Sequence, residues 1–354
     1  MNERIGILRR KMKESYVDGM IISNPVNIKY LTNINAEGTL LLTQKENIYI
    51  TDGRYMELAN NILTIDDEII VQNIMDVSYV DYENMFMLCQ NVGFEEKYVT
   101  YEKYKNIMQI YKVNNLVETD GIVERQRIIK DKMEIECMKK AAEITDSCFS
   151  HIIEHIRPGM TEKEIALEIE RYFKLSGAEG AAFDTIVASG ANSSMPHAIP
   201  TDKKIEKRDI ITIDMGAKYN GYCSDMTRTI FVGEVDEGYK KIYDLVATIQ
   251  NNVSRNIGEN VKISYLAKLA NEMLEREGFI MPHSLGHGVG MEIHEYPTGF
   301  SKTDNLLKSG MVITNEPGIY ILGKFGVRIE DTILVTAAGN VNLTQSTKDY
   351  VVIR

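Results

Sequence analysis

The chain has 354 residues, 44% of them hydrophobic, which is enough for two domains that each bury a core. Its net charge of −11 at pH 7 argues against nucleic acid or an anionic membrane as the main partner. No apolar run approaches the roughly 18 residues of a membrane span, no signal-peptide core follows Met1, and the four cysteines form no Cys-x-x-Cys pair. We therefore expect a cytoplasmic protein with reduced thiols and no membrane partner.

Residues 1 to about 120 combine short β runs with polar helical stretches, which predicts a small α/β domain. The β runs lie at 19–22, 39–42 and 47–50. A turn at Thr119-Asp120-Gly121 separates this region from the rest of the chain. We therefore place two domains, at residues 1–122 and 123–354.

An amphipathic helix opens the second domain. Apolar residues recur at helical spacing over residues 131–156, and Arg157-Pro158-Gly159 ends the pattern. Thr161 and Glu164 have the spacing of a capping box, which predicts a second helix that continues to Leu175.

Two histidines, His151 and His155, lie four residues apart near the end of the first helix. Glu154 and Arg157 are their charged neighbours. Such a pair could bind a metal, but we interpret it as a solvated helix end.

A β-hairpin is predicted between residues 210 and 230. Ile210 to Asp214 is a strand, Asn220-Gly221 is a strong hairpin turn, and the return strand follows. This register puts Asp225 opposite Gly216, on the face that Asp214 shares. The two carboxylates are therefore expected to be neighbours, even if a bulge shifts the pairing by one residue.

Histidines and glycines alternate in the segment 282–295. Ser284 stands where the His-Glu-x-x-His zinc helix needs a glutamate, and the glycines at 286, 288 and 290 disfavour any helix. We expect a strand or loop in which the glycines let the backbone approach bound metals closely. A phosphate loop is a weaker alternative, because no complete motif is present.

Two later strands carry glutamates. Side-chain alternation puts Thr314 beside Glu316, and it puts Arg328 on the face of Glu330, with the apolar residues between them toward the core.

Five residues of metal-ligand type thus stand in a fixed order: Asp214, Asp225, His287, Glu316 and Glu330. One imidazole with four carboxylates suits manganese, cobalt or zinc better than thiolate-preferring metals. Four carboxylates around one divalent ion would leave a charge of about −2 in a partly desolvated pocket, whereas two ions balance them. Two ions about 3.5 to 4 Å apart are a known hydrolytic arrangement. The set therefore predicts a dinuclear, metal-dependent hydrolase.

These segments resemble the dinuclear "pita-bread" metallopeptidases, and within them the Xaa-Pro aminopeptidases and Xaa-Pro dipeptidases (prolidases). The resemblance is carried by Asp214–Ala217, Gly221–Thr229, Gly286–Gly290, His294–Pro297, Glu316–Tyr320 and Val327–Asp331. Asn24–Thr32 and Thr51–Tyr55 resemble the creatinase-type domain that precedes the catalytic domain in this branch. Asn33 and Arg208 depart from the pattern, since a glycine is more usual in such segments. The implied fold class is α+β, with a small α/β creatinase-type N-terminal domain followed by a pita-bread (methionine-aminopeptidase-like) catalytic domain.

The resemblance implies hydrolysis of the bond between an N-terminal residue and a following proline in short peptides. It implies two divalent ions, with manganese preferred over cobalt or zinc. Asp214 would bind one ion and His287 the other, Asp225 and Glu330 would bind both, and Glu316 would be a ligand and the general base.

Four further residues are candidates on the substrate side. His197, in a proline-bracketed loop, and His294 would stabilise the transition state and assist the leaving nitrogen. His283 and Arg328 are candidate substrate-binding residues, and a supporting role beside the ligands is the alternative for each. The resemblance also implies a homodimer whose N-terminal domain restricts substrates to short peptides.

Three other interpretations are weighed against this one. A methionine aminopeptidase-like general aminopeptidase would share all five ligands, but it usually lacks the N-terminal domain. A creatinase-like amidinohydrolase would have lost the ligands, and a non-catalytic pita-bread binding protein would have degenerate ligand positions. The sequence does not separate a dipeptidase from an aminopeptidase.

Overall fold

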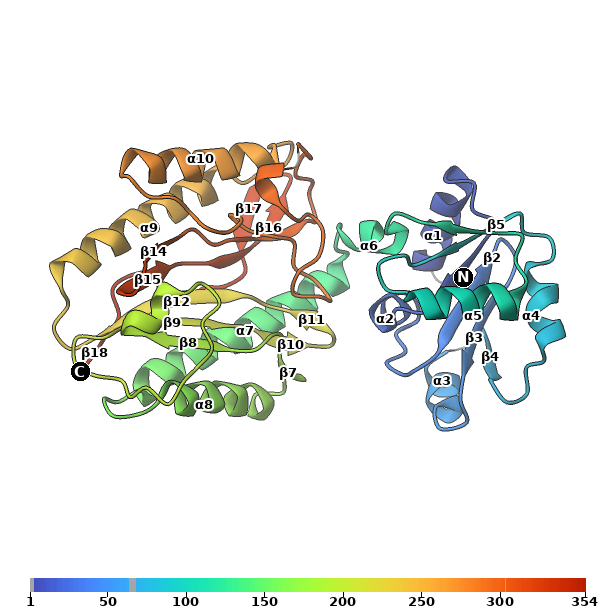
Figure 1. Ribbon diagram of the computed structural model, residues 1–354, viewed down its shortest axis with the longest axis horizontal. Helices are drawn as coiled ribbons and strands as arrows, with labels where there is room; N and C mark the ends of the chain where they lie inside the picture. Colours follow the sequence, from blue (N-terminus) through green and yellow to red (C-terminus); the bar gives the residue numbers. More distant parts are fainter. Residues whose placement is uncertain (1–2, 64–67, 303) are drawn as a thin grey trace. The chain divides into compact units, whose positions relative to one another are not determined.

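The computed structural model of the protein describes residues 3–63, 68–302 and 304–354. It divides into two compact units, Met1–Arg127 and Ile128–Arg354 (Figure 1). This division lies slightly later than the one at 122/123 expected from the sequence. The reason is helix α6 (Ile122–Arg127), whose Gln126 donates to the Arg4 carbonyl at 2.9 Å and whose Arg127 donates to Asn27 at 2.9 Å, so that this helix packs with the N-terminal unit.

The N-terminal unit is built on a six-stranded mixed sheet with the order β4-β3-β2-β1-β5-β6. Its strands are β1 (Gly19–Ile22), β2 (Thr39–Thr43), β3 (Asn47–Thr51), β4 (Ile70–Asn73), β5 (Asn91–Phe94) and β6 (Asn115–Glu118). Its other helices are α1 (Glu3–Glu14), α2 (Pro25–Thr32), α3 (Met56–Ile62), α4 (Tyr79–Phe86) and α5 (Tyr101–Tyr111). The three β runs predicted from the sequence are β1, β2 and β3, so the small α/β domain is confirmed.

The first half of the C-terminal unit packs a helix pair on a sheet. Helices α7 (Lys132–His155) and α8 (Glu162–Leu175) share a buried apolar core with β8 (Ile186–Ser189), β9 (Ile210–Met215) and β12 (Met226–Val232), and β18 (Val352–Ile353) completes the sheet order β18-β12-β9-β8. A small sheet of β7 (Gly180–Ala181), β10 (Ala217–Tyr219) and β11 (Tyr222–Cys223) adjoins it. Both predicted helices are confirmed, including the capping box of Thr161 and Glu164.

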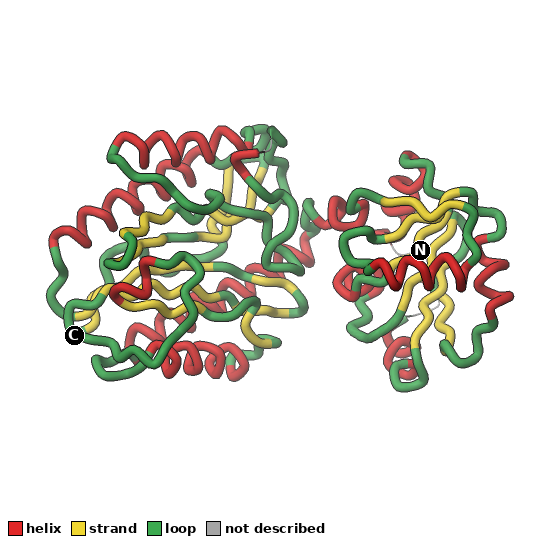
Figure 2. The backbone as a smooth tube through the Cα atoms, viewed as in Figure 1, coloured by secondary structure: helices red, strands yellow, loops and turns green. Residues whose placement is uncertain are grey.

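The second half repeats this arrangement with a different helix pair. Helices α9 (Glu237–Asn256) and α10 (Ile263–Arg276) pack through a second core on the remaining strands, which are β13 (Val312–Asn315), β14 (Gly318–Ile321), β15 (Phe325–Arg328), β16 (Asp331–Thr336) and β17 (Gly339–Asn342). Among the described residues, the short 3₁₀ helices η2 (Gly190–Ser194) and η3 (Phe300–Lys302) lie in connecting loops. Figure 2 shows the helix pairs on opposite sides of this unit, with the strands between them. The predicted α+β class is confirmed.

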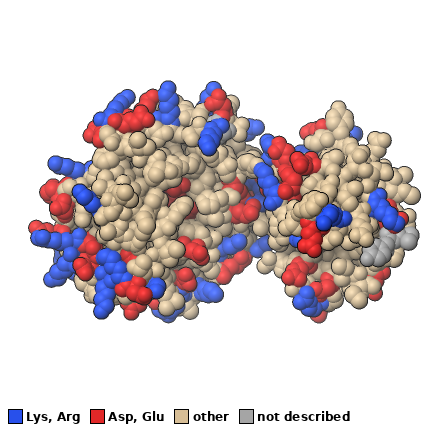
Figure 3. Space-filling model, in the orientation of Figure 1, with Lys and Arg blue, Asp and Glu red and all other residues tan. Residues whose placement is uncertain are grey.

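Over the described residues, no helix is both long and apolar enough to cross a bilayer. On the face shown in Figure 3, charged side chains of both signs are interspersed around the periphery of the C-terminal unit.

Candidate active site

The hairpin that carries the first two acidic residues has the predicted register. Asp214 pairs with Thr227 on the return strand, and Tyr219 pairs with Tyr222 at the turn, which places Asp225 opposite Gly216 without a shift. The return strand is interrupted there, and Asp225 lies in the gap between β11 and β12. The two aspartates therefore come to one cavity from opposite strands of a single hairpin.

A cavity of about 370 Å³ lies within the C-terminal unit. All nine residues that the sequence singled out for the site line it: His197, Asp214, Asp225, His283, His287, His294, Glu316, Arg328 and Glu330. Phe183, Ile186, Pro196 and Ile293 add apolar walls. A cavity of this size and mixed lining suits a small ligand with a few convergent polar groups.

The five candidate ligands line the same cavity, and three of them form a close group. Asp225, His287 and Glu330 each offer a ligand atom, and these atoms lie within 4.8 Å of one another. His287 Nε2 is 3.5 Å from Asp225 Oδ2 and 3.5 Å from Glu316 Oε1. Asp214 Oδ1 is buried and has no hydrogen-bond partner in the described part of the chain. The unpartnered oxygen and the clustered acceptors are what a cation site requires.

The electrostatics of the cluster also indicate a cation site. Burial, and then the neighbouring carboxylates, raise the pKa of Asp225 and of Glu330 well above the usual value. Burial raises the pKa of the Glu316 carboxyl to about 8. Arg328 is the one side-chain cation that lines the described cavity. Additional positive charge is therefore needed to hold all the carboxylates ionised, and divalent ions would supply it.

His287 has the form of a neutral metal ligand. Burial lowers the pKa of its imidazole to about 4. Its Nδ1 lies 3.1 Å from the Gly288 carbonyl, to which it can donate, and this leaves the Nε2 lone pair directed toward the carboxylates. The backbone of His287 is fixed beside β13, because its N–H donates to Thr314 Oγ1 at 3.0 Å and its carbonyl accepts from the Thr314 N–H at 2.8 Å.

The glycines around His287 let the backbone approach its neighbours closely. A Cβ atom at Gly286 would lie 2.3 Å from the Thr314 carbonyl oxygen, and one at Gly288 would lie 2.2 Å from the Tyr296 carbonyl oxygen. The close approach that they permit is therefore between neighbouring backbone segments. The segment has no helix, and Gly288 forms isolated bridges with Ile313 and Glu295, in agreement with the predicted strand or loop.

Arg328 is engaged by protein groups on every side. It donates from Nη2 to Asp214 Oδ2 at 2.7 Å, from Nε to Thr227 Oγ1 at 3.0 Å, and from Nη1 to Tyr320 Oη at 2.8 Å and the Pro196 carbonyl at 3.0 Å. These bonds fix the orientation of Asp214, and they connect the loop that carries His197 with the strand that carries Arg328.

The three other histidines that line the cavity differ in their exposure to solvent. The ring of His294 is 4.3 Å from that of His287, edge to face, and the residue is otherwise exposed. His197 is also exposed. His283 is half-buried, with Nδ1 2.8 Å from the Ser284 carbonyl and Nε2 3.0 Å from Tyr320 Oη. Burial lowers the pKa of His283 to about 4, so it is a neutral, packed group.

Two residues that contact the candidate site residues have no role assigned from the sequence. Thr227 Oγ1 donates to Glu330 Oε2 at 2.6 Å, and Tyr320 Oη connects Arg328 with His283. The alternation rule could have found Thr227, because it follows Asp225 by two positions. Tyr320 ends the segment Glu316–Tyr320 that carries part of the resemblance, but its contact with His283 joins positions 37 residues apart, which no local rule pairs.

Glu162 is a buried carboxylate that organises the loop with His197. Its Oε1 accepts from the Ser189 N–H and hydroxyl, and its Oε2 accepts from Asn192 Nδ2 and from the Thr201 N–H and hydroxyl, all within 2.6–2.9 Å. It therefore connects the chain before His197 with the chain after it.

Replacing Glu162 with glutamine is expected to lower the free energy of unfolding by about 1–3 kcal/mol, because an amide NH₂ would face hydrogen-bond donors in a buried site. Denaturant unfolding measures this change. Glu170→Gln, at an exposed position on the same helix, is the matched control and should have almost no effect. Equal stability of the two variants would contradict the assigned role.

Comparisons with known proteins complete the description of the site. The model of metallopeptidase family M24 matches residues 136–337, and that of the creatinase/prolidase N-terminal domain matches residues 4–129. The chain is 36% identical to the Xaa-Pro dipeptidase of Pyrococcus furiosus, over 99% of both sequences. The solved structure of an Xaa-Pro dipeptidase from Bacillus anthracis is 37% identical and superposes with a TM-score of 0.94 over 99% of both chains. An X-Pro aminopeptidase from Thermotoga maritima is 32% identical with a TM-score of 0.89, over 97% of this chain and 100% of that one.

Proposed function

Because the chain belongs to metallopeptidase family M24 and carries a creatinase/prolidase N-terminal domain, we propose that it hydrolyses the peptide bond between an N-terminal residue and a following proline. The protein is a metallopeptidase of the pita-bread fold. The single observation that carries the proposal is the convergence of all five ligand-type residues on one cavity, in a chain related over its whole length to Xaa-Pro dipeptidases.

The proposed cofactors are two divalent ions, with manganese favoured because the ligand set is rich in oxygen. Asp214 would hold one ion, His287 and Glu316 the other, and Asp225 and Glu330 would contact both. Ions bound there would supply Lewis acidity toward the peptide carbonyl and the attacking water. The buried Asp214 Oδ1, which has no partner among the described residues, supports this assignment.

Glu316 is proposed as the general base. It lies on the cavity wall immediately after β13, where Thr314 Oγ1 donates to its Oε1 at 3.3 Å. Its Oε2 lies 4.0 Å from His283 Nδ1 and accepts no hydrogen bond from a described residue, so it could accept a proton from water. The proton would then pass to the leaving nitrogen of proline.

His197 and His294 are proposed to act on the substrate. Both are exposed cavity-lining residues outside the five-ligand set. Each could donate a hydrogen bond to the carbonyl oxygen as it gains negative charge. Arg328 and His283, by contrast, have their hydrogen bonds filled by protein groups, which supports a role in orienting Asp214 and Tyr320.

Alanine at His197 or at His294 is expected to lower kcat by roughly 10- to 10³-fold, because a donor to the transition state is lost. Metal content should stay at the wild-type value in both variants. Steady-state kinetics together with elemental analysis tests this. Loss of metal from either variant would assign that histidine to the ligands and contradict the proposal.

The cavity also suits a proline ring. Phe183, Pro196 and Ile293 provide an apolar wall beside the ligand cluster. Proline has no N–H in its peptide bond, so an enzyme that relies on this donor is handicapped, and a dedicated apolar site is favourable.

The peptide-length preference is tested with a panel of Xaa-Pro and Xaa-Pro-Yaa peptides, each with added manganese, cobalt or zinc. Hydrolysis of both lengths at the proline bond supports the proposed activity, and the ratio of the two rates separates a dipeptidase from an aminopeptidase. Failure of every peptide with every metal would leave a non-catalytic binding protein as the better account. We place this activity in the cytoplasm.

We further propose a homodimer in which the N-terminal unit restricts substrate length. This unit carries no cluster of ligand-type residues among its described residues. Deleting residues 1–127 is expected to dissociate the dimer or to admit longer peptides. Sedimentation and a peptide-length series measure the two effects. A stable monomer at micromolar concentration, with unchanged length preference after truncation, would refute the proposal.

A further inference from the structure

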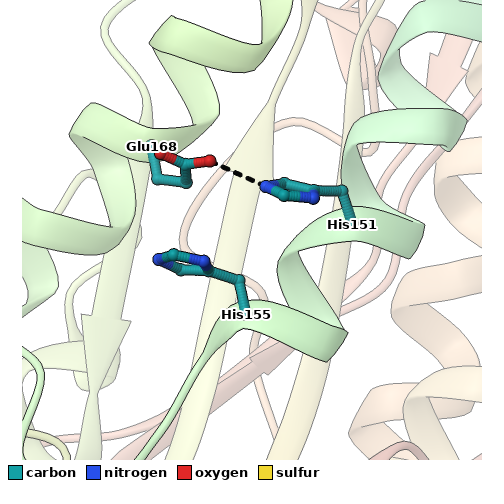
Figure 4. A group of neighbouring side chains, drawn as sticks. All are labelled: His151, His155 and Glu168. Carbon is teal, nitrogen blue, oxygen red and sulfur yellow. Dashed lines mark hydrogen bonds and ion pairs between the residues drawn. The ribbon is translucent and has the colours of Figure 1, made fainter.

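A second group of ligand-type side chains lies on the C-terminal unit, away from the cavity. His151 and His155 project from α7, and Glu168 projects toward them from α8 (Figure 4). Each offers one ligand atom, and these three atoms lie within 4.8 Å of one another. His151 Nε2 is 2.7 Å from Glu168 Oε1. The sequence alone suggested a solvated helix end, because the third member of the group lies on another helix.

The group is supported by a rigid framework. Cys148 and Ile152 on α7 pack with Ile165 and Ile169 on α8 in one buried core, which fixes the two helices that carry the ligand atoms. The ring of His151 stacks on Tyr172 at 4.8 Å and on His155 at 5.6 Å. The imidazoles are therefore held near Glu168 by packing as well as by the hydrogen bond.

The group is also accessible to solvent, and its carboxylate has an arginine as a neighbour. The His151 side chain is 35% exposed and that of Glu168 is 12% exposed, so an ion and a water molecule could reach them. Arg171 donates to both oxygens of Glu168, at 2.9 and 3.1 Å. The carboxylate therefore has a cationic neighbour, with which a bound ion would compete.

We propose that His151, His155 and Glu168 form a zinc site that joins α7 to α8. Two imidazoles and one carboxylate are a known zinc ligand set, with water in the fourth position. Ligand atoms about 2.0 Å from a tetrahedral ion lie about 3.3 Å apart, so small side-chain rotations convert the observed spacing into coordination. Arg171 would have to share Glu168 with the ion, or release it.

The proposed site differs from the cavity in the metal that it selects. Two of its three ligands are imidazoles, which suit zinc, cobalt and nickel better than manganese. The cavity offers four carboxylates and one imidazole, a set that suits manganese. A manganese-loaded protein should therefore still take up zinc at the helix pair. The inference does not depend on the proposed peptidase activity.

The experiment compares zinc uptake by manganese-loaded full-length protein with that of His155→Gln. This variant removes one ligand but keeps the hydrogen bond between His151 and Glu168, so the fold should be retained. Glu154→Gln is the matched control, because it removes an exposed charge from the same helix turn outside the group. Calorimetric titration with zinc chloride and elemental analysis after dialysis give the number of ions bound. Zinc that exchanges into the cavity is common to all three proteins and cancels in the comparison.

Wild type and Glu154→Gln are expected to bind one more zinc ion per chain than His155→Gln, or to bind it at least about tenfold more tightly. Zinc should also raise the thermal unfolding temperature further in wild type than in His155→Gln, because an ion that binds the folded state stabilises it. Glu168→Gln should behave like His155→Gln. Equal zinc stoichiometry and affinity in wild type and His155→Gln would overturn the proposal.

Discussion

Dialysis of the protein against a chelator is expected to abolish Xaa-Pro hydrolysis, and added manganese or cobalt is expected to restore it. The reason is that the cavity gathers four carboxylates with one arginine, and Arg328 is already committed to Asp214 and its neighbours. Without divalent ions the cluster has neither charge balance nor a Lewis acid. Peptidase assays on dialysed and reconstituted samples, with elemental analysis of each, measure the effect. Full activity in protein shown to be free of metal would contradict the mechanism.

Substitution of Glu316 by glutamine is expected to reduce kcat by roughly 10² or more, because the proposed general base is lost while the shape of the side chain is kept. The oxygen that accepts from Thr314 survives in glutamine, so the local fold should not change. Single-turnover and steady-state rates measure the loss. Glu292→Gln is a matched control, since Glu292 belongs to the same unit but does not line the cavity.

The Glu316 result has to be interpreted together with metal content. If Glu316→Gln binds normal amounts of metal and keeps a near-normal kcat, Glu316 is not the base. If it loses one ion, the ligand role dominates, and the rate should recover partly at high metal concentration.

Local features were predictable from the sequence because a few neighbouring residues determine them. The Asn220-Gly221 turn fixes the hairpin register, and side-chain alternation then places Asp214 and Asp225 on one face. The capping box at Thr161 fixes the start of α8 in the same way. In each case the short-range signal agrees with the final fold.

Backbone conformation explains the two departures from the family pattern. Asn33 has φ of 62° and Arg208 has φ of 74°, both in the left-handed region that favours glycine. Asn33 ends α2, where asparagine is well tolerated. Arg208 lies in a loop, and its N–H donates to the Val232 carbonyl at 2.7 Å. The more usual glycine at these positions therefore has a conformational basis, and neither residue lines the cavity.

Contacts between distant segments were not predictable. Glu162 organises the His197 loop through partners up to 39 positions away, and Tyr320 contacts His283, which lies 37 positions earlier in the chain. The sequence does not connect His151 with Glu168 either, because the two residues are 17 positions apart on different helices. The two halves of the C-terminal unit have similar folds, but the sequence shows no repeat. Packing a helix pair on a sheet constrains which positions are apolar rather than which residues occupy them.

The most direct test of the central claim compares matched peptides that differ only at the second residue, proline in one and alanine in the other. The measurement is kcat/KM on manganese-loaded protein, with Asp225→Asn as the control for the metal site. The proline peptide is expected to exceed the alanine peptide by at least about tenfold, the range that a filled apolar pocket supplies, and Asp225→Asn should hydrolyse neither. Equal or faster hydrolysis of the alanine peptide would contradict the proposed specificity and favour a general aminopeptidase.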